Sequence, residues 1–191
     1  MGIGLFGKVP QKADFVALNL PPAILHPLEQ WLEAAVAESR AVLGEQWLEA
    51  FLVSPIWRFW IGQSVFGQGC CGAVMPSVDA VGRYFPLVMT AWNADGSAPA
   101  SPLIDPADEW YGEVEERLLS VLRTEGPPEL AGLIQGLDEP APAIVPPPAE
   151  TEEQSCWWQG NQANGAGEIL VHSGLPAPGF YAELIRLSVT N

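Results

Sequence analysis

The hydrophobic positions of the first fifty residues change from a short apolar run to a long helical stripe. Residues 3–6 are apolar and precede Gly7, which predicts a strand, and residues 8–14 predict a loop. From about residue 27 to residue 43, apolar side chains recur at helical spacing, with Pro27 suited to the first turn and Gly44 to the end. A shorter helix is predicted for residues 45–52, before Pro55. The longer helix is predicted to bury Leu28, Trp31, Leu32, Ala35, Ser39, Val42 and Leu43.

After residue 55 the pattern changes to aromatic and branched runs separated by glycines. Residues 56–62, 64–75 and 85–92 predict three consecutive strands. Their short connections favour antiparallel pairing, because a parallel crossover needs about a dozen residues or more. Asp105 as a cap and Pro106 at the first helical position then predict a helix. Its predicted buried face carries Ala107, Trp110, Val114, Leu118, Val121 and Leu122, and a further short helix is predicted after Pro127 and Pro128.

Residues 138–154 interrupt this pattern with five prolines and five acidic residues in seventeen positions. This composition predicts an extended and mobile surface connection, since proline removes hydrogen-bond donors and the acids repel one another. Residues 155–158 and 168–173 predict two more strands, and Pro178 opens a predicted last helix through Phe180, Tyr181, Leu184 and Ile185. We therefore expect one domain over residues 1–191, of the α/β class and α+β type. Its mostly antiparallel sheet would have about five strands, flanked by helices.

Composition and charge indicate a globular cytoplasmic protein with an acidic second half. Hydrophobic residues make up 48% of the chain and eight residues are tryptophan, which is enough for a core. The net charge is −15: residues 1–92 hold seven acids and five bases (−2), and residues 93–191 hold sixteen acids and three bases (−13). This excess of acid predicts no nucleic-acid partner. No apolar run nears the roughly 20 residues of a membrane span, and no secretion signal is recognisable, so we expect no direct membrane insertion.

No residue pattern points to catalysis, a metal or a cofactor. The sequence lacks phosphate-binding glycine loops, nucleophile elbows and metal-ligand spacings. A serine–histidine–aspartate assembly could be drawn from Ser77, His172 and Asp79, but no spacing requires it. The odd number of cysteines, three, predicts reduced and partly buried thiols. We therefore expect no catalytic residues, no metal ligands and no cofactor.

Residues 75–89 form an apolar stretch that contains one acid and one base, Asp79 and Arg83, with Gly82 between them. If the two charged side chains face each other, their hydrogen bond would hold the turn, and Gly82 would supply a positive φ. This structural interpretation is the simpler one. The alternative is that such an ordered loop presents a surface to a partner, close to other charged residues of the first half.

The bases of the first half suggest where that surface would be. Lys8, Lys12, Arg58 and Arg83 lie in or beside predicted strands and loops, among aromatic residues. They could converge on one site, where arginine stacks on aromatic rings as readily in packing as in binding. A second hypothesis is that Lys8, Arg58 and Arg83 bind a phosphate, a nucleotide or another small anion.

Three stretches resemble the signature of a known family. Residues 4–16, 51–61 and 72–89 are similar, in order and spacing, to the TagF family, also called ImpM, of the bacterial type VI secretion system. The resemblance rests on Gly7, Lys8, Pro10, Asp14, Phe15, Trp57, Arg58, Phe59 and the segment 75–86, which reads MPSVDAVGRYFP. It is strong over residues 1–92 and looser beyond them.

The resemblance implies a cytoplasmic accessory protein without enzymatic activity and with a fold similar to longin-type domains. Members act as post-translational regulators, typically repressors, through contact with a forkhead-associated scaffold protein of the secretion system. They work beside a threonine kinase and phosphatase pathway. The residues that it singles out, as partner-binding or as structural parts of the motif, are Lys8, Asp14, Phe15, Trp57, Arg58, Ser77, Asp79, Gly82, Arg83 and Tyr84.

Overall fold

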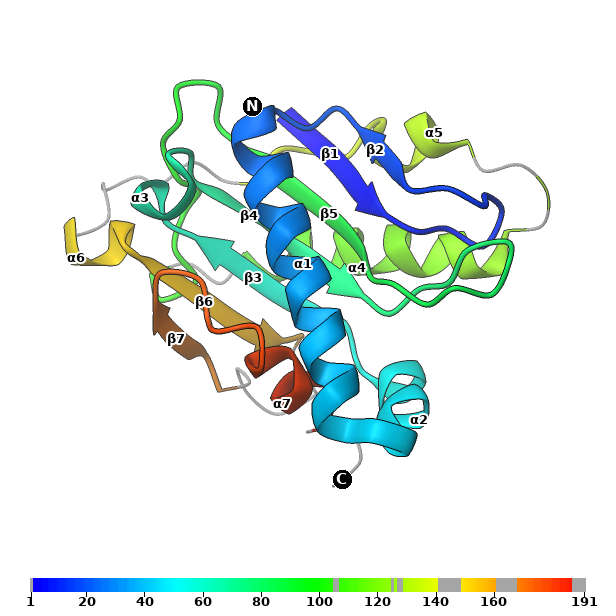
Figure 1. The fold of residues 1–191 in the computed structure, drawn as a ribbon. Coiled ribbons are helices and arrows are strands. Elements are labelled where there is room, and N and C mark those ends of the chain that lie inside the picture. Colours follow the sequence, from blue (N-terminus) through cyan, green and yellow to red (C-terminus); the bar gives the residue numbers. More distant parts are fainter. Residues whose placement is uncertain are drawn as a thin grey trace.

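One antiparallel sheet of seven strands organises the molecule, in the order β2-β1-β5-β4-β3-β6-β7 (Figure 1). The structure is a computed structural model that describes residues 2–104, 107–124, 126, 129–140, 149–160 and 168–186. Every neighbouring pair of strands is antiparallel, as predicted. The strands are β1 (Gly2–Gly7), β2 (Val16–Leu18), β3 (Trp57–Ile61), β4 (Cys70–Met75), β5 (Leu87–Trp92), β6 (Gln154–Gln159) and β7 (Leu170–Ser173).

The sheet has seven strands rather than the expected five or so, and one predicted strand begins with a helical turn instead. The short strand β2 pairs with β1 after the loop of residues 8–15 and was not predicted, since three residues carry little periodicity. The predicted strand over residues 64–75 contains the helical turn α3 (Gln63–Phe66) before β4 begins. Gly67, with φ +75°, ends that turn in the left-handed conformation that glycine readily adopts.

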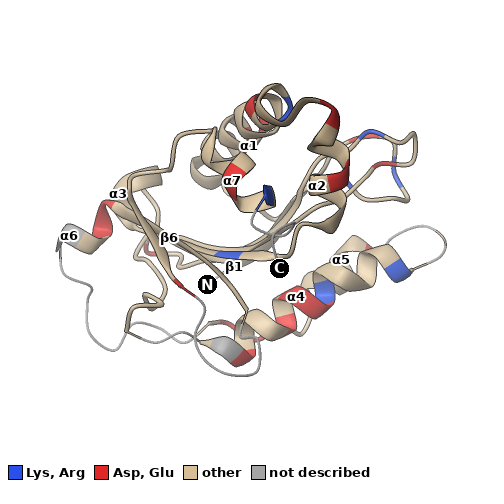
Figure 2. Ribbon diagram, turned by 90° about the horizontal axis from the view of Figure 1, so that it is seen from below, with Lys and Arg blue, Asp and Glu red and all other residues tan. Residues whose placement is uncertain are grey.

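Helices cover both faces of the sheet, as the edge-on view shows (Figure 2). The first face carries α1 (Pro22–Leu43), the 3₁₀ turn η1 (Gly44–Gln46), α2 (Trp47–Val53) and α7 (Phe180–Arg186). The second carries α4 (Asp108–Arg123) and α5 (Leu130–Ile134), while α6 (Ala149–Glu152) lies at an end of the sheet near α3. None of the described helices has both the length and the apolar character needed to cross a membrane.

Strand alternation divides the apolar side chains between two cores. In β3, Trp57, Phe59 and Ile61 join the core beneath α1, while Trp60 joins the core beneath α4. The same alternation directs Arg58 to the α4 face. Because both faces are covered, the central strands read as nearly continuous apolar runs.

The long helix differs from its prediction in two respects. It begins at Pro22 and therefore contains Pro27, which removes one backbone hydrogen bond within the helix. Val42 was expected to be buried and is 53% exposed. Ser39 is buried as predicted, because its hydroxyl donates to the Val36 carbonyl and accepts the Trp47 indole N–H at 2.8 Å.

The structure confirms the helices and the last two strands predicted for the second half of the chain. The short helix after Pro127 and Pro128 is present as α5, but these prolines, with Asp105 and Pro106, lie outside the described residues. Within residues 138–154, the last part forms α6 and the start of β6 rather than an extended connection. Residues 141–148 lie outside the described part, and mobility there stays a prediction.

Two predictions about burial in the cores need correction. The three cysteines are free, as expected, but they are fully rather than partly buried, and burial raises the pKa of Cys156 to about 11. Leu122 was placed on the buried face of α4 but is 48% exposed. Four of the other five residues on that predicted face are buried, and Ala107 is partly buried.

We expect Leu118→Ala to lower the free energy of unfolding by about 2–5 kcal/mol, because its fully buried side chain would leave a cavity under α4. The matched substitution Leu122→Ala on the same helix should change it by less than about 0.5 kcal/mol. Urea unfolding of both variants tests the assignment. Equal losses would contradict the orientation of α4.

Candidate functional site

Two loops meet at the end of the sheet where β1 ends and β5 begins (Figure 1). Residues 8–15 follow β1 and residues 76–86 connect β4 to β5, and we call them the paired loops. Gly7 lies opposite Leu87 in the sheet, so the loops emerge side by side. A Cβ at Gly7, whose φ is +135°, would overlap the carbonyl oxygen of Pro86. Only glycine permits this approach.

The carboxylate of Asp79 lies at the centre of the paired loops, with no exposed side-chain surface. Its Oδ2 atom accepts the Lys8 ammonium group at 2.6 Å and the Arg83 Nε–H at 2.7 Å. Its Oδ1 atom accepts the backbone N–H groups of Val81 and Arg83 at 3.1 and 2.8 Å. Four donors thus compensate for the burial of one carboxylate.

These contacts set the pKa of the Asp79 carboxyl well below its usual range. Burial alone would raise the pKa, but the Lys8 ammonium, the two backbone N–H groups and the Arg83 guanidinium all stabilise the charged form. Asp79 is therefore ionised at neutral pH. The predicted pair of Asp79 and Arg83 is present, whereas the role of Lys8 as a third member was not foreseen.

Further hydrogen bonds join the two loops directly. The Arg83 guanidinium also donates to the Ala13 carbonyl, and the Ala80 N–H donates to the Lys12 carbonyl at 3.0 Å. Gly82 has φ +84°, which confirms the predicted positive value in this turn. Because each loop supplies donors or acceptors to the other, neither is held by its own sequence alone.

Aromatic packing supports the same junction. The ring of Phe15 stacks on Phe6 with 5.7 Å between centroids and meets Phe85 edge-on at 4.8 Å. The Lys8 ammonium lies 5.0 Å from the centre of the Phe15 ring, within the range of a cation–π contact. Phe15 is nevertheless 45% exposed, so one side of its ring faces solvent.

The outward side of the paired loops combines apolar and charged side chains. Val81 is 64% exposed and the side chain of Arg83 is 58% exposed. Lys12 and Asp14 are exposed beside Phe15. This composition, with an arginine and an aromatic ring among apolar groups, is typical of protein–protein interfaces.

Tyr84 connects the paired loops to α2. Its ring meets Trp47 and Phe51 edge-on, with centroid distances of 6.4 and 6.2 Å. Its carbonyl accepts a hydrogen bond from Arg40 at 3.4 Å. The adjoining helix also exposes the apolar side chains of Leu48, Leu52 and Val53.

Arg58 does not join the other predicted cations. It points to the α4 face, where its Nε atom lies 2.6 Å from Oε1 of Glu115 and its guanidinium lies 5.4 Å from the Tyr111 ring. β3 is three strands from β1 in the sheet, or about 14 Å at the usual strand spacing. The expectation that Lys8, Arg58 and Arg83 converge is therefore wrong, because alternation and strand order separate them. Trp57 is buried on the α1 face.

Ser77 and His172 do not form a catalytic assembly. Ser77 follows the end of β4, whereas His172 lies in β7, three strands away, opposite Ser155. The register through β6 and β3 places His172 at the other end of the strands, where its ring packs against Phe180. Ser77 is buried, and its hydroxyl has no hydrogen-bond partner among the described residues. Within the same part of the chain, no group of acidic, histidine or cysteine side chains has an arrangement suited to a metal ion.

Comparisons with known proteins show which family these motifs belong to. Residues 4–133 match the family model of the TagF N-terminal domain, described as type VI secretion system-associated. Among solved structures, the crystal structure of PA0076 from Pseudomonas aeruginosa PAO1 is similar to this chain, with 30% sequence identity and a TM-score of 0.78. The similarity covers 96% of this chain and 93% of that chain. No curated protein matches the chain.

We expect Asp79→Asn to destabilise the protein at neutral pH and to have less effect in acid. Because the pKa of Asp79 is lower in the folded than in the unfolded protein, its stabilisation is complete above the unfolded pKa of about 4. It is lost as the pH falls further, toward the folded pKa. The difference in unfolding free energy between wild type and variant, measured in urea, should therefore shrink below about pH 4. A difference that is the same at every pH would contradict this role, and Asp14→Asn, at an exposed position, is the control.

We expect Gly82→Ala to lower the free energy of unfolding by about 1–2 kcal/mol, since alanine resists a positive φ. Gly112, inside α4, is the matched control, because Gly112→Ala should instead stabilise by roughly 0.5–1 kcal/mol. At both positions an added Cβ meets no atom of the described residues within 4 Å, so the comparison isolates backbone conformation. In thermal unfolding, we expect Gly82→Ala to lower the melting temperature and Gly112→Ala to raise it. An unchanged melting temperature for Gly82→Ala would contradict the prediction.

Proposed function

Because the chain belongs to the TagF family of type VI secretion system-associated proteins, we propose that it regulates this secretion system after translation, as a repressor. In this proposal it acts in the cytoplasm and without enzymatic activity. It binds the forkhead-associated scaffold protein of the system through the exposed side of the paired loops and the adjoining α2.

The observation that carries this proposal is that the charged residues of the family motif hold the paired loops together and leave apolar side chains exposed. Lys8, Asp79 and Arg83 bind one another inside the paired loops. The network therefore holds the exposed Phe15 and Val81 in place. Loops that are already ordered lose little conformational entropy when a partner binds them, which favours affinity.

The chemistry of the exposed surface fits a protein partner better than a small anion. Phe15 and Val81 supply apolar area, and Arg83 adds a cation at the edge. On the adjoining α2, Leu52 is a further exposed apolar side chain, at 57% exposure. An anion site would need uncommitted cations, whereas Lys8 and Arg83 are bound to Asp79 and Arg58 lies on the other face of the sheet.

Binding to the forkhead-associated scaffold protein encoded with the same secretion system tests the proposal. We expect Val81→Glu to weaken binding by about tenfold or more, because it introduces a charge at an exposed apolar position of the proposed contact. Leu52→Glu on α2 should weaken binding as well. Leu103→Glu, at an exposed leucine in the loop that follows β5 at the other end of the sheet, is the matched control and should bind as wild type does. Calorimetric titration gives the affinities, and circular dichroism confirms that each variant is folded.

Two results would overturn the proposed contact. In the first, folded Val81→Glu and Leu52→Glu bind the scaffold as tightly as wild type, which would exclude this surface. In the second, the wild-type protein does not bind the scaffold at all. Secretion assays in a strain that lacks the gene test repression separately, because loss of a repressor should increase secretion.

A further inference from the structure

β7 forms one edge of the sheet. It pairs with β6 on one side, and among the described residues no strand pairs with it on the other. Its four residues contain no proline and no lysine, which are the residues that commonly protect such edges. The opposite edge strand, β2, has three residues and lies shortly before Pro21 and Pro22. β7, with four residues, is the longer of the two edge strands.

The register shows which backbone groups of β7 face outward. The Gly174 N–H donates to the Glu153 carbonyl at 2.6 Å, and His172 lies opposite Ser155. Hydrogen-bonded positions alternate in an antiparallel pair, so His172 also directs its backbone groups toward β6. The N–H and C=O groups of Val171 and Ser173 consequently point to the open edge. Outward backbone groups on every second residue are what an added strand needs for its hydrogen bonds.

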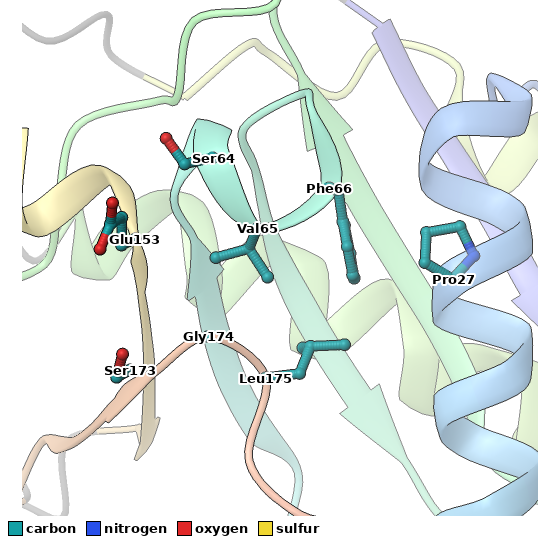
Figure 3. Close-up of a pocket in the computed structure, with 8 residues that line it drawn as sticks. All are labelled: Pro27, Ser64, Val65, Phe66, Glu153, Ser173, Gly174 and Leu175. Atoms are coloured by element: carbon teal, nitrogen blue, oxygen red, sulfur yellow. The ribbon is translucent and has the colours of Figure 1, made fainter.

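Two hollows border this edge and could receive side chains of an added strand. One has a volume of about 560 Å³ and lies between β7 and α7, with apolar walls from Leu170, Val171 and Phe180. The other, about 430 Å³, lies beyond the end of β7. Figure 3 shows Val65 and Phe66 of α3 and Leu175 facing one another in this second hollow.

Charges around the edge determine which partner fits. Glu168 and Glu183 line the first hollow, Glu153 lines the second, and Arg186 is the base among these lining residues. These four charges sum to −2, which favours a positively charged segment. A second copy of the chain is disfavoured, because each copy carries a net charge of −15.

We propose that the open edge of β7 binds an extended, positively charged segment of a partner protein as an additional antiparallel or parallel strand. Backbone hydrogen bonds to Val171 and Ser173 provide the attachment, and apolar side chains of the segment enter the hollows. Lysine or arginine side chains of the segment face Glu168 and Glu183. This surface is separate from the paired loops and does not depend on the function proposed for them.

Fluorescence-anisotropy titrations of the full chain with labelled synthetic peptides of about ten residues test the proposal. In the basic peptides valine or phenylalanine alternates with lysine, and in matched acidic peptides glutamate replaces lysine. We expect the basic peptides to bind at least about tenfold more tightly than the acidic ones. Basic peptides with N-methyl groups on all backbone nitrogens should lose binding, since neither edge of such a peptide can donate the strand hydrogen bonds.

Substitutions in β7 and around it locate the site. Val171→Pro removes an outward N–H and should weaken binding of the basic peptides by about tenfold or more, whereas Val171→Thr keeps that donor and should retain binding. The double variant Glu168→Lys and Glu183→Lys should reverse the preference in favour of the acidic peptides. Val81→Glu should bind the peptides as wild type does, which separates this surface from the paired loops. Circular dichroism confirms the folding of each variant.

Four results would overturn the proposal. These are failure of every basic peptide to bind, equal binding of basic and acidic peptides, equal binding of N-methylated peptides, and normal binding by folded Val171→Pro. Sedimentation velocity tests whether the edge binds a second copy of the chain. A wild-type dimer that Val171→Pro converts to monomer would assign the edge to a second copy of the chain instead.

Discussion

The buried carboxylate of Asp79 is the constraint on which this end of the molecule depends. A charged carboxylate is costly to bury without partners, so the fold must bring Lys8 and Arg83 to it. Lys8 lies 71 positions from Asp79 in sequence, and it reaches the carboxylate because β1 and β5 are neighbours in the sheet. The ion pair thus couples strand order to the shape of the paired loops, and through them to the exposed positions of Phe15 and Val81.

The sheet separates the charged motif residues of this sequence into two structural units on opposite faces. Lys8, Asp79 and Arg83 join the paired loops, while Arg58 joins β3 to α4 through Glu115. The Lys8–Asp79 and Arg58–Glu115 pairs are shielded ion pairs between segments far apart in the chain. Breaking either pair would leave a charge with reduced access to water, so these motif residues stabilise the fold without needing to touch a partner.

The two proposed surfaces would recognise a partner through different interactions. The paired loops and α2 offer fixed side chains, so recognition there depends on shape and on the identity of Phe15, Val81 and Leu52. The β7 edge offers backbone groups, and its selectivity comes from the charges of Glu168 and Glu183 and from the hollows beside it. A protein with both could hold one partner at two points or two partners at once.

The sequence by itself determined most of the elements, because helical and strand periodicity depend on near neighbours in the chain. It also determined the turn in which Asp79 and Arg83 face each other around Gly82, since four residues suffice to form it. Only the tertiary structure decided that Lys8 completes this turn, that Arg58 points to the other face, and that β7 becomes an edge. These outcomes depend on strand order, which is set when the apolar faces of distant segments pack together, and no local pattern records that choice.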